Sequence, residues 1–343
     1  MHRMMQRTTA VIGAGNWGTA LAKHVAERGN PVTIWAFEPE VVQGINEKHE
    51  NLFYLQEHRL PDNLRATGDL AEAVHGADVV LLAMPSHVFR KVLASAAPHV
   101  PPEAPLVVAT KGIEEETCLI MPEVAAEVLG WKAWQRVAVL SGPSFAKELA
   151  RGDPTVVSLA CRNLPLAEDL QRFLSGELLR VYATEDVVGV ALGGAVKNVI
   201  AIAVGAATGL GLGHNSRAAL MTRGLAEVTR LAVQRGANPL TLAGLSGIGD
   251  LVLTCTGELS RNRAVGEALG RGEKLSDIVG RTRQVAEGVH NARSVRQLAQ
   301  RAGVEMPISE VVYRALYEDL PPPQAVGILM GRTLRHERDD KGR

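Results

Sequence analysis

The stretch AVIGAGNWGTAL, residues 10–21, decides the fold of this chain. Gly13, Gly15 and Gly18 have the G-x-G-x-x-G spacing, after a short apolar run and before a helical pattern at 17–29. In such a loop the first glycine permits a tight turn, the second lets the backbone approach a pyrophosphate, and the third allows close packing of helix on strand. The start of the helix adds free N–H groups and a positive dipole end. A purely structural turn is the alternative, but the context predicts a dinucleotide-binding unit.

Strand-like and helix-like segments alternate on both sides of this motif. The strand-like runs are residues 9–12, 32–35, 79–83, 106–110, 137–140, 155–160 and 178–183. Such alternation is typical of a mostly parallel sheet with helices on both faces. From about Asp186 the runs disappear, and apolar residues recur three and four apart in 214–236, 291–303 and 308–320. We therefore predict an α/β fold, with a doubly wound Rossmann-type domain over 1–185 and an all-α substrate-binding and catalytic domain over 186–343.

Composition excludes several classes of partner. Lys+Arg and Asp+Glu both number 37, so the net charge of zero provides no general field for nucleic acid or an anionic membrane. Cys118, Cys161 and Cys255 are odd in number and far apart, which argues against a disulfide framework or a metal site and favours the reducing cytoplasm. The first 15 residues lack the apolar segment of a signal peptide, and glycines and a lysine interrupt the longest apolar run. We expect a cytoplasmic protein without membrane insertion that acts on a small molecule.

The cofactor motif is completed by an acidic residue further along the chain. Glu38 lies twenty residues after Gly18, where a carboxylate holds the ribose hydroxyls of NAD. Phe37 precedes it and could lie against the adenine. Residues 32–42 contain no cation for the 2′-phosphate of NADP, so the sequence favours NAD over NADP. A solvated loop carboxylate is the other interpretation of Glu38.

A single lysine interrupts the most apolar segment, ALGGAVKNVIAIAVGAATG at 191–209. In a helix, Lys197 lies one turn from Gly193 and Gly194, and glycines inside a helix cost about 1 kcal/mol each relative to alanine. The glycine pair beside the lysine therefore suggests that something must come close to the helix there. Apolar surroundings lower the pKa of an ammonium group, which makes a lysine a competent general acid–base. A lysine that extends to solvent from a buried helix is the alternative.

A second polar group follows in residues 244–269. Asp250 comes after a glycine-rich turn, and Ser260 is a plausible N-cap with Arg261 and Asn262 behind it. An arginine and an amide at a helix N-terminus form a good phosphate receptor, although an ordinary exposed cap has the same sequence.

Two loops of the first half point to the same site. Lys111 lies just past one expected strand, and Ser141, Gly142 and Ser144 lie at the end of another. Ligands of open parallel sheets bind at these carboxyl ends. A surface lysine without a role is the alternative for Lys111.

Together these motifs resemble one family. GAGNWGTAL, ATKG, SGPSFAKELA, LGGAVKNVIAI, GIGDLVLTCTGELSRNR and VAEGV (285–289) are similar, in family order, to the soluble NAD(P)-dependent sn-glycerol-3-phosphate dehydrogenases. The likeness extends from residue 10 to at least 332. Residues 34–64 resemble the eukaryotic, NAD-using branch, whereas the other blocks look bacterial. Bacterial members commonly have a basic residue where Phe37 stands, which agrees with NAD as the preferred cofactor and NADP as a possible one.

The resemblance implies reversible reduction of dihydroxyacetone phosphate to sn-glycerol 3-phosphate, as a supply for glycerophospholipid synthesis, by a homodimer. It implies that Lys197 is the proton donor or acceptor at C2, that Asp250 orients it, and that Lys111 contacts substrate and cofactor. Arg261 and Asn262 would take the phosphate, Ala146 would lie near the nicotinamide, and Glu287 would contact the cofactor. The residues expected at the substrate are Lys111, Gly142, Ser144, Lys197, Asp250, Ser260, Arg261 and Asn262. Those expected at the cofactor are Gly13, Gly15, Asn16, Trp17, Gly18, Phe37, Glu38, Lys111, Ala146, Arg261 and Glu287.

Two other functions fit parts of the pattern. A related two-domain dehydrogenase of a 3-hydroxy acid or a sugar-acid phosphate also uses a lysine on the first long helix, but generally lacks GDLVLTC…SRN. A non-catalytic NAD(H) sensor would need the loop at 13–18 but not Lys197, Asp250 and Arg261 together.

Overall fold

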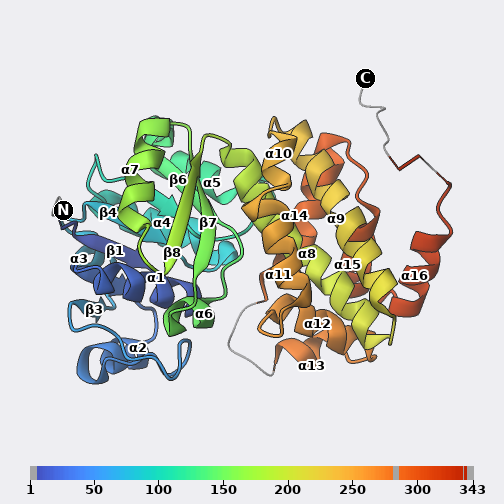
Figure 1. Cartoon of the computed structure of the whole chain (residues 1–343), viewed down its shortest axis with the longest axis horizontal. Helices are drawn as coiled ribbons and strands as arrows, with labels where there is room; N and C mark the ends of the chain where they lie inside the picture. The colour runs from blue at the N-terminus through green and yellow to red at the C-terminus, as the bar shows by residue number, and fades with distance from the viewer. Residues whose placement is uncertain (1–5, 281–285, 335, 338–343) are drawn as a thin grey trace.

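A sheet-containing part and a helical part lie side by side in the computed structural model (Figure 1). The structure describes residues 6–280, 286–334 and 336–337. Residues 1–5 of the first predicted domain and residues 338–343 of the second lie outside these ranges. Val285, at the start of the 285–289 motif, lies outside them too. The last strand ends at Thr184, and the first long helix of the second part begins at Val187. The boundary predicted at residue 185 falls between these two elements.

The first part is built on one eight-stranded sheet with the order β3-β2-β1-β4-β5-β6-β7-β8. All neighbouring strands are parallel except β6 and β7, so the mostly parallel sheet is confirmed. The expected runs all form strands, but β3 was not predicted. The strands are β1 (Thr9–Ile12), β2 (Val32–Trp35), β3 (Leu64–Thr67), β4 (Val79–Leu82), β5 (Leu106–Val108), β6 (Val137–Ser141), β7 (Thr155–Cys161) and β8 (Leu179–Thr184).

Strand β1 lies where the order of the strands reverses. Thr9 is in register with Val32 of β2 on one side and with Val79 of β4 on the other. The chain leaves β1 directly into the glycine loop, so this loop lies at the topological switch point, where open parallel sheets bind ligands.

Both faces of the sheet are buried, as a doubly wound fold requires. Val11 joins an apolar cluster that includes Leu21, whereas its neighbours Ala10 and Ile12 join a separate cluster that includes Phe89. Alternate residues of a strand point to opposite faces, so helices cover both. The helices of this part are α1 (Asn16–Glu27), α2 (Pro39–Gln43), α3 (Leu70–Val74), α4 (Phe89–Ala96), α5 (Met121–Val128), α6 (Ala146–Arg151) and α7 (Leu164–Leu174).

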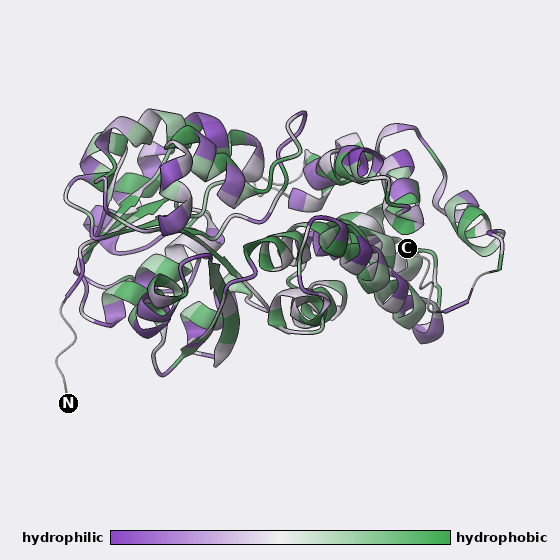
Figure 2. Ribbon diagram, turned by 90° about the horizontal axis from the view of Figure 1, so that it is seen from above, coloured by the Kyte–Doolittle hydropathy of each residue, from purple (hydrophilic) through white to green (hydrophobic). Residues whose placement is uncertain are grey.

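The second part is packed around one central helix, α8 (Val187–Gly209). Asp186 caps this helix by accepting a hydrogen bond from the backbone N–H of Gly189, 2.8 Å away. Figure 2 shows helices of this part with both hydrophobic and hydrophilic residues, as expected for helices that bury one face. The other helices are α9 (His214–Gln234), α10 (Pro239–Leu242), α11 (Asp250–Thr256), α12 (Arg261–Gly270), α13 (Leu275–Val279), α14 (Glu287–Ala302), α15 (Pro307–Tyr317) and α16 (Pro322–Met330). A five-residue π-helix, η5 (Leu245–Gly249), leads into α11.

Two described segments, 187–209 and 239–256, are long and apolar enough to cross a membrane. In the first, 94% of the 18-residue window is buried inside the protein, compared with 39% in the second. The first segment is α8, so its apolar character is accounted for by its position in the core of the helical part.

Candidate active site between the two parts

Lys197 does not reach solvent from α8, because its amine is enclosed. The residue is 6% exposed, and its Nζ donates hydrogen bonds to Oδ1 of Asp250 and, at 2.7 Å, to Oγ1 of Thr254. The Thr254 hydroxyl in turn donates to the backbone carbonyl of Asp250, also at 2.7 Å. Asp250 and Thr254 are four residues apart on α11, so both face the same turn of α8.

The second oxygen of Asp250 connects this group to the sheet. Nζ of Lys111 donates to Oδ2 of Asp250 at 2.7 Å and to the backbone carbonyl of Gly142 at 3.2 Å. Lys111 follows β5 and Gly142 follows β6, so the lysine connects two carboxyl ends of strands to α11 of the helical part. Asp250 is 0% exposed and accepts from an ammonium group on each side, which compensates for burial of its charge.

The surroundings of Lys197 bring the pKa of its amine close to neutrality. Burial lowers the pKa of Lys197 from its ordinary value to about 7, the nearby Asp250 carboxylate opposes this decrease, and the Lys111 charge adds to it. A group with a pKa near neutrality can give and take a proton with similar ease. The cluster therefore has the properties of a general acid–base site.

The glycine pair on α8 explains how the surrounding elements approach so closely. A methyl group on Gly193 would overlap the backbone carbonyl of Ser246 in η5. A methyl group on Gly194 would overlap the hydroxyl of Ser141 at the end of β6. The close approach expected from the sequence is thus made by one element of each part of the molecule.

The predicted phosphate receptor lies at the start of α12. Oγ of Ser260 accepts from the backbone N–H of Arg263 at 3.2 Å, which confirms Ser260 as the N-cap. Arg261 is exposed to solvent, yet desolvation by the surrounding protein lowers its pKa, as expected for a side chain in a concave site. The Arg261 side chain is accessible to an anion, and its place in the first turn of α12 adds the favourable helix dipole.

Asn262 has a structural role in addition to the one predicted for it. Its Nδ2 donates to Oδ1 of Asn198 at 2.9 Å, and its Oδ1 accepts from the backbone N–H of Gly288 at 2.9 Å. The side chain thus joins α8, α12 and α14 and is nearly buried. Among the described residues its Nδ2 donates to Asn198, which leaves the second amide hydrogen for a ligand.

The glycine loop has the geometry that a pyrophosphate needs. Gly13 has a φ of +113°, and a methyl group on it would lie 2.8 Å from the backbone nitrogen of Met84. A methyl group on Gly15 would meet open space, so the backbone is accessible at this point. No side chain caps α1, and the buried Oδ1 of Asn16 has no partner within the described part of the chain. These free polar groups fit a dinucleotide.

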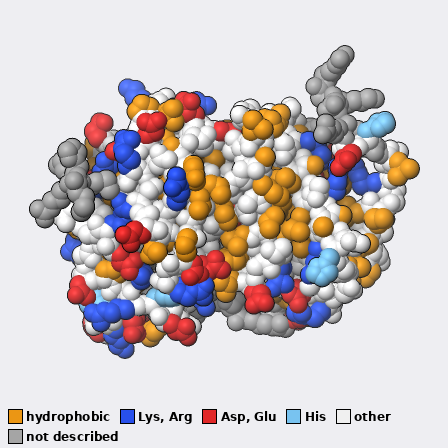
Figure 3. Space-filling view, viewed as in Figure 1, with side chains coloured by type: hydrophobic (Ala, Val, Ile, Leu, Met, Phe, Trp, Pro, Cys, Tyr) orange, Lys and Arg blue, Asp and Glu red, His pale blue; other side chains and the backbone are white. Residues whose placement is uncertain are grey.

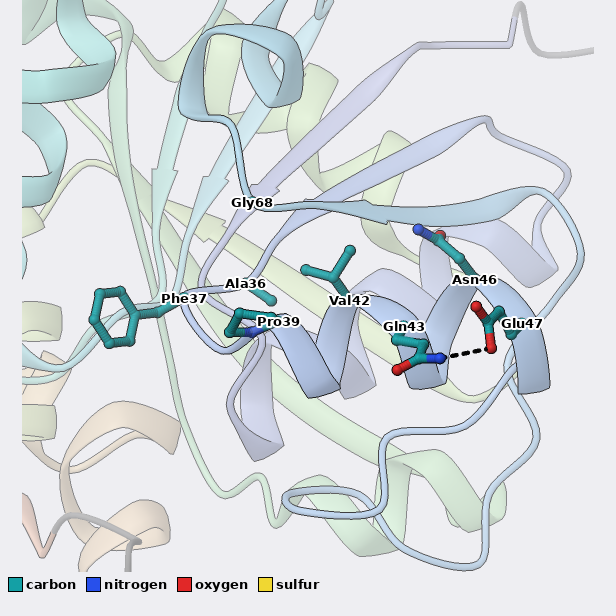
Figure 4. Close-up of a pocket in the computed structure, with 8 residues that line it drawn as sticks. All are labelled: Ala36, Phe37, Pro39, Val42, Gln43, Asn46, Glu47 and Gly68. Carbon is teal, nitrogen blue, oxygen red and sulfur yellow. Dashed lines mark hydrogen bonds between the residues drawn. The ribbon is translucent and has the colours of Figure 1, made fainter.

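The residues expected at the adenosine end lie after β2, apart from the lysine cluster. Phe37 is 81% exposed and, in Figure 4, projects from the loop away from Val42 and Gln43 of α2. It borders a pocket of about 330 Å³. Oε1 of Glu38 accepts from the hydroxyl of Tyr54 at 2.6 Å, so this carboxylate is held by a neighbour rather than free in solvent. The pocket is lined by Ala36, Phe37, Pro39, Val42, Gln43, Asn46, Glu47 and Gly68.

Other predicted residues lie where the two parts of the molecule meet. Glu287 is the first residue of α14 and accepts hydrogen bonds from the backbone N–H of Ser86, at 3.2 Å, and from the Ser86 hydroxyl. The hydroxyl of Ser144 donates to the carbonyl of Gly142 at 2.8 Å, and Ala146 is the first residue of α6. Trp17, in the first turn of α1, packs on the apolar cluster of the sheet.

The sequence did not identify three residues of this region, namely Thr254, Asn198 and Ser86. Thr254 lies four positions after Asp250, so helical spacing alone placed it on the same face. Asn198 was visible only as the polar neighbour of Lys197. Ser86 had no signal in the sequence, since its partner Glu287 lies 201 residues further along the chain.

Comparison with known proteins agrees with this arrangement. Residues 8–167 match the family described as NAD-dependent glycerol-3-phosphate dehydrogenase N-terminus, and residues 186–327 match the family described as NAD-dependent glycerol-3-phosphate dehydrogenase C-terminus. The chain belongs to the NAD-dependent glycerol-3-phosphate dehydrogenase family.

Relatives in this glycerol-3-phosphate dehydrogenase family are similar over nearly their whole length. Glycerol-3-phosphate dehydrogenase [NAD(P)+] of Citrifermentans bemidjiense is 50% identical over 333 residues, which is 97% of this chain and 99% of that protein. The protein of the same name from Myxococcus xanthus is 52% identical over 96% of this chain and 98% of its own. The crystal structure of glycerol-3-phosphate dehydrogenase from Coxiella burnetii has a TM-score of 0.91 at 42% identity, covering 95% of this chain and 99% of that one. The family resemblance inferred from the motifs is confirmed.

Proposed function

We propose that the protein catalyses the reversible reduction of dihydroxyacetone phosphate to sn-glycerol 3-phosphate with NADH, and that Lys197 is the proton donor and acceptor. The observation that carries the proposal is the Lys197–Asp250–Lys111 cluster, in which Lys197 and Asp250 are buried and Lys111 is partly buried, and which joins the sheet-containing part to the helical part. The choice of substrate is supported by the relatives, which are named glycerol-3-phosphate dehydrogenase and match this chain over nearly their whole length.

The residues of the cluster divide the chemistry among them. When bound, NADH supplies the hydride to C2 of the substrate. The Lys197 ammonium donates its proton to the oxygen on C2, where negative charge develops, and the neutral amine removes that proton in the reverse direction. Asp250 orients the amine through Oδ1 and keeps its pKa from decreasing further. The positive charge of Lys111 favours the same developing alkoxide.

Specificity for a phosphorylated ketone is assigned to the start of α12. The Arg261 guanidinium offers forked, charge-assisted hydrogen bonds, and the backbone N–H groups of the first turn add to them. Asn262 ties this helix terminus to Asn198, next to Lys197, so the phosphate receptor and the proton donor keep a fixed relation. This link supports a short substrate with its phosphate close to the reacting carbon.

The proposed cofactor preference and class of partner rest on the charges of the site and of the surface. Glu38, held by Tyr54, favours the ribose hydroxyls of NAD over the 2′-phosphate of NADP. Charged side chains of both signs are interspersed on the face shown in Figure 3, in keeping with a small-molecule substrate rather than nucleic acid or membrane. We also propose a cytoplasmic homodimer that supplies glycerophospholipid synthesis, and sedimentation tests the dimer.

The deciding experiment measures oxidation of NADH and of NADPH by the purified protein with a panel of ketones. Dihydroxyacetone phosphate with NADH should give the highest kcat/KM. Faster turnover of a 3-oxo acid or a sugar-acid phosphate would assign the protein to a related dehydrogenase. Binding of NADH without turnover of any ketone would indicate a sensor.

A further inference from the structure

The π-helix η5 packs its backbone directly on α8. Gly193 has no side chain at the point of contact, and a methyl group there would overlap the carbonyl oxygen and carbon of Ser246. Because the obstacle is backbone, it cannot turn aside as a side chain can. Ser246 is 1% exposed, and its hydroxyl has no hydrogen-bond partner in the described part of the chain, so its contribution to this contact is the carbonyl.

This contact lies four residues before the Lys197–Asp250 contact on both of the segments that meet. Gly193 precedes Lys197 by four residues on α8, and Ser246 precedes Asp250 by four residues across the junction of η5 and α11. Helix α8 therefore meets the continuous segment η5–α11 twice, once through Gly193 and the Ser246 carbonyl and once through Lys197 and Asp250. Because η5 leads directly into α11, the separation of η5 from α8 bears on the position of the Asp250 carboxylate.

We propose that Gly193 and the backbone of Ser246 form a positioning element that holds Asp250 within hydrogen-bonding distance of the Lys197 amine. This inference rests on the proposed role of Lys197 as proton donor and acceptor. Neither residue contacts the reacting groups, so the effect on catalysis passes through Asp250. Single turns of π-helix are rare in proteins, and they occur frequently at functional sites.

The neighbouring glycines of α8 provide the contrast. A methyl group on Gly194 meets the Ser141 hydroxyl, a side chain that can rotate. A methyl group on Gly209 meets the Glu267 carbonyl of α12, a backbone obstacle like that at Gly193 but at the other end of the helix. Gly209→Ala is therefore the matched control for Gly193→Ala, because both create the same type of clash.

Displacement of Asp250 should change the pH dependence of ketone reduction, which a general loosening of the fold would not change. The titratable groups that face the Lys197 amine in the described part of the chain are Asp250 and Cys255 of α11 and Lys111 after β5. Burial raises the pKa of the Cys255 thiol to about 12, so this group stays neutral. If Asp250 retreats, the ammonium loses its favourable charge while Lys111 remains. The decline of ketone reduction at high pH should then move to lower pH.

The test compares two pairs of variants of the full chain. Ser246→Gly loosens the π-helix without adding atoms, whereas Ser246→Ala removes the same unpartnered hydroxyl and keeps the backbone restricted. Gly193→Ala displaces η5, whereas Gly209→Ala displaces α12. For each variant we would measure kcat for dihydroxyacetone phosphate against pH, the Kd of NADH, and thermal unfolding.

We expect Ser246→Gly and Gly193→Ala to lower kcat by about 10-fold to 100-fold, the range caused by misplacement of a catalytic group by about 1 Å. Their reduction profile should shift to lower pH, with the Kd of NADH within about twofold of the wild type, because the glycine loop is untouched. Ser246→Ala should retain the kcat and the pH profile of the wild type. Gly209→Ala, which displaces the C-terminal end of α12 near Glu267 and Gly270, should retain the pH profile because it leaves Asp250 in place.

Unchanged kcat and pH profile in Ser246→Gly would overturn the inference, and this variant decides even where Gly193→Ala does not fold. Equal shifts of the pH profile in Gly193→Ala and Gly209→Ala would also overturn it, because the effect would then come from any disturbance of α8. Failure of the wild-type protein to reduce dihydroxyacetone phosphate would instead refute the proposed function.

Discussion

Lys197 and Asp250 form an ion pair inside the protein although 53 residues separate them in the chain. Both side chains are almost completely buried, at 7% and 1% exposure, so each depends on the other to compensate for the loss of hydration. The carboxylate is shared with Lys111, which leaves one negative charge between two amines. One of these amines can therefore lose its proton without leaving Asp250 unpaired.

Replacement of Lys197 by alanine should abolish most of the catalysis and spare cofactor binding. Loss of a general acid–base typically costs about 10²-fold or more in rate. The glycine loop at 13–18 is not altered, so NADH affinity should be retained. Single-turnover rates and NADH fluorescence titration check the two halves of this prediction. Lys132→Ala, at an exposed lysine, is the control, and near-normal turnover of Lys197→Ala would refute the role of the amine.

The two directions of the reaction should depend on pH with opposite sign. Reduction requires the Lys197 ammonium, so its rate should fall as the pH rises through about 7, the pKa of this group. Oxidation of the alcohol requires the neutral amine, so its rate should fall as the pH decreases through the same value. Initial rates in both directions on one enzyme preparation provide the measurement. Parallel profiles in the two directions would contradict the assignment of the titrating group.

The fold was predictable where the sequence has a strong local pattern, and the exceptions have physical reasons. The glycine loop and the apolar runs located seven of the eight strands. The missed strand β3 is LRAT, in which an exposed arginine interrupts a very short apolar pattern. The antiparallel pairing of β6 with β7 was also beyond prediction, because strand direction depends on how the connecting segments cross the sheet.

The site was predictable where a residue type conflicts with its surroundings. An ammonium group and two glycines in the most apolar helix identified Lys197 and the close packing around it. Thr254 presents no such conflict, since a threonine in a helix is ordinary until its partner is known. The double role of Asn262 and the contact of Glu287 with Ser86 depend on long-range pairing, which one sequence does not encode locally.

Arg261→Ala should weaken binding of the phosphorylated substrate selectively. A hydrogen bond to a charged group contributes about 1.5–3 kcal/mol, so KM for dihydroxyacetone phosphate should rise by about 10-fold to 100-fold. KM for an unphosphorylated ketone should change little. Arg271→Ala, after the last turn of the same helix, is the control. Equal effects of Arg261→Ala on both substrates would show that the arginine does not hold the phosphate.

Glu38→Ala should reduce the preference for NADH over NADPH. The carboxylate favours the ribose hydroxyls and repels a 2′-phosphate, so its removal should lower kcat/KM with NADH and raise it with NADPH. We expect the NADH to NADPH ratio to fall by about 10-fold, equivalent to roughly 1.4 kcal/mol. Glu40→Ala, at the next carboxylate along the chain in the first turn of α2, is the control. A wild-type protein that prefers NADPH would refute the assignment directly.

Glu227→Ala should destabilise the helical part without touching the reacting groups. The buried Glu227 carboxylate of α9 accepts from the backbone N–H groups of Ile308, at 2.6 Å, and Ser309, at 3.1 Å, and thereby caps α15. Buried donors left without partners cost about 1–3 kcal/mol each, so the free energy of unfolding should fall by about 2 kcal/mol or more. Gln234→Ala, at the exposed end of α9, should change it by less than about 0.5 kcal/mol.

The pH dependence of stability provides a second measurement on Glu227. Burial raises the pKa of this carboxyl from 4.5 to about 7, so between these values the folded state binds more protons than the unfolded state. The contribution of this group to stability is therefore present at low pH and is lost as the pH rises through about 7. Urea unfolding of the wild type and of Glu227→Ala across this window should give curves that approach each other as the pH rises. A constant difference between the two proteins over the window would show that the carboxyl titrates at its ordinary pKa in the folded state.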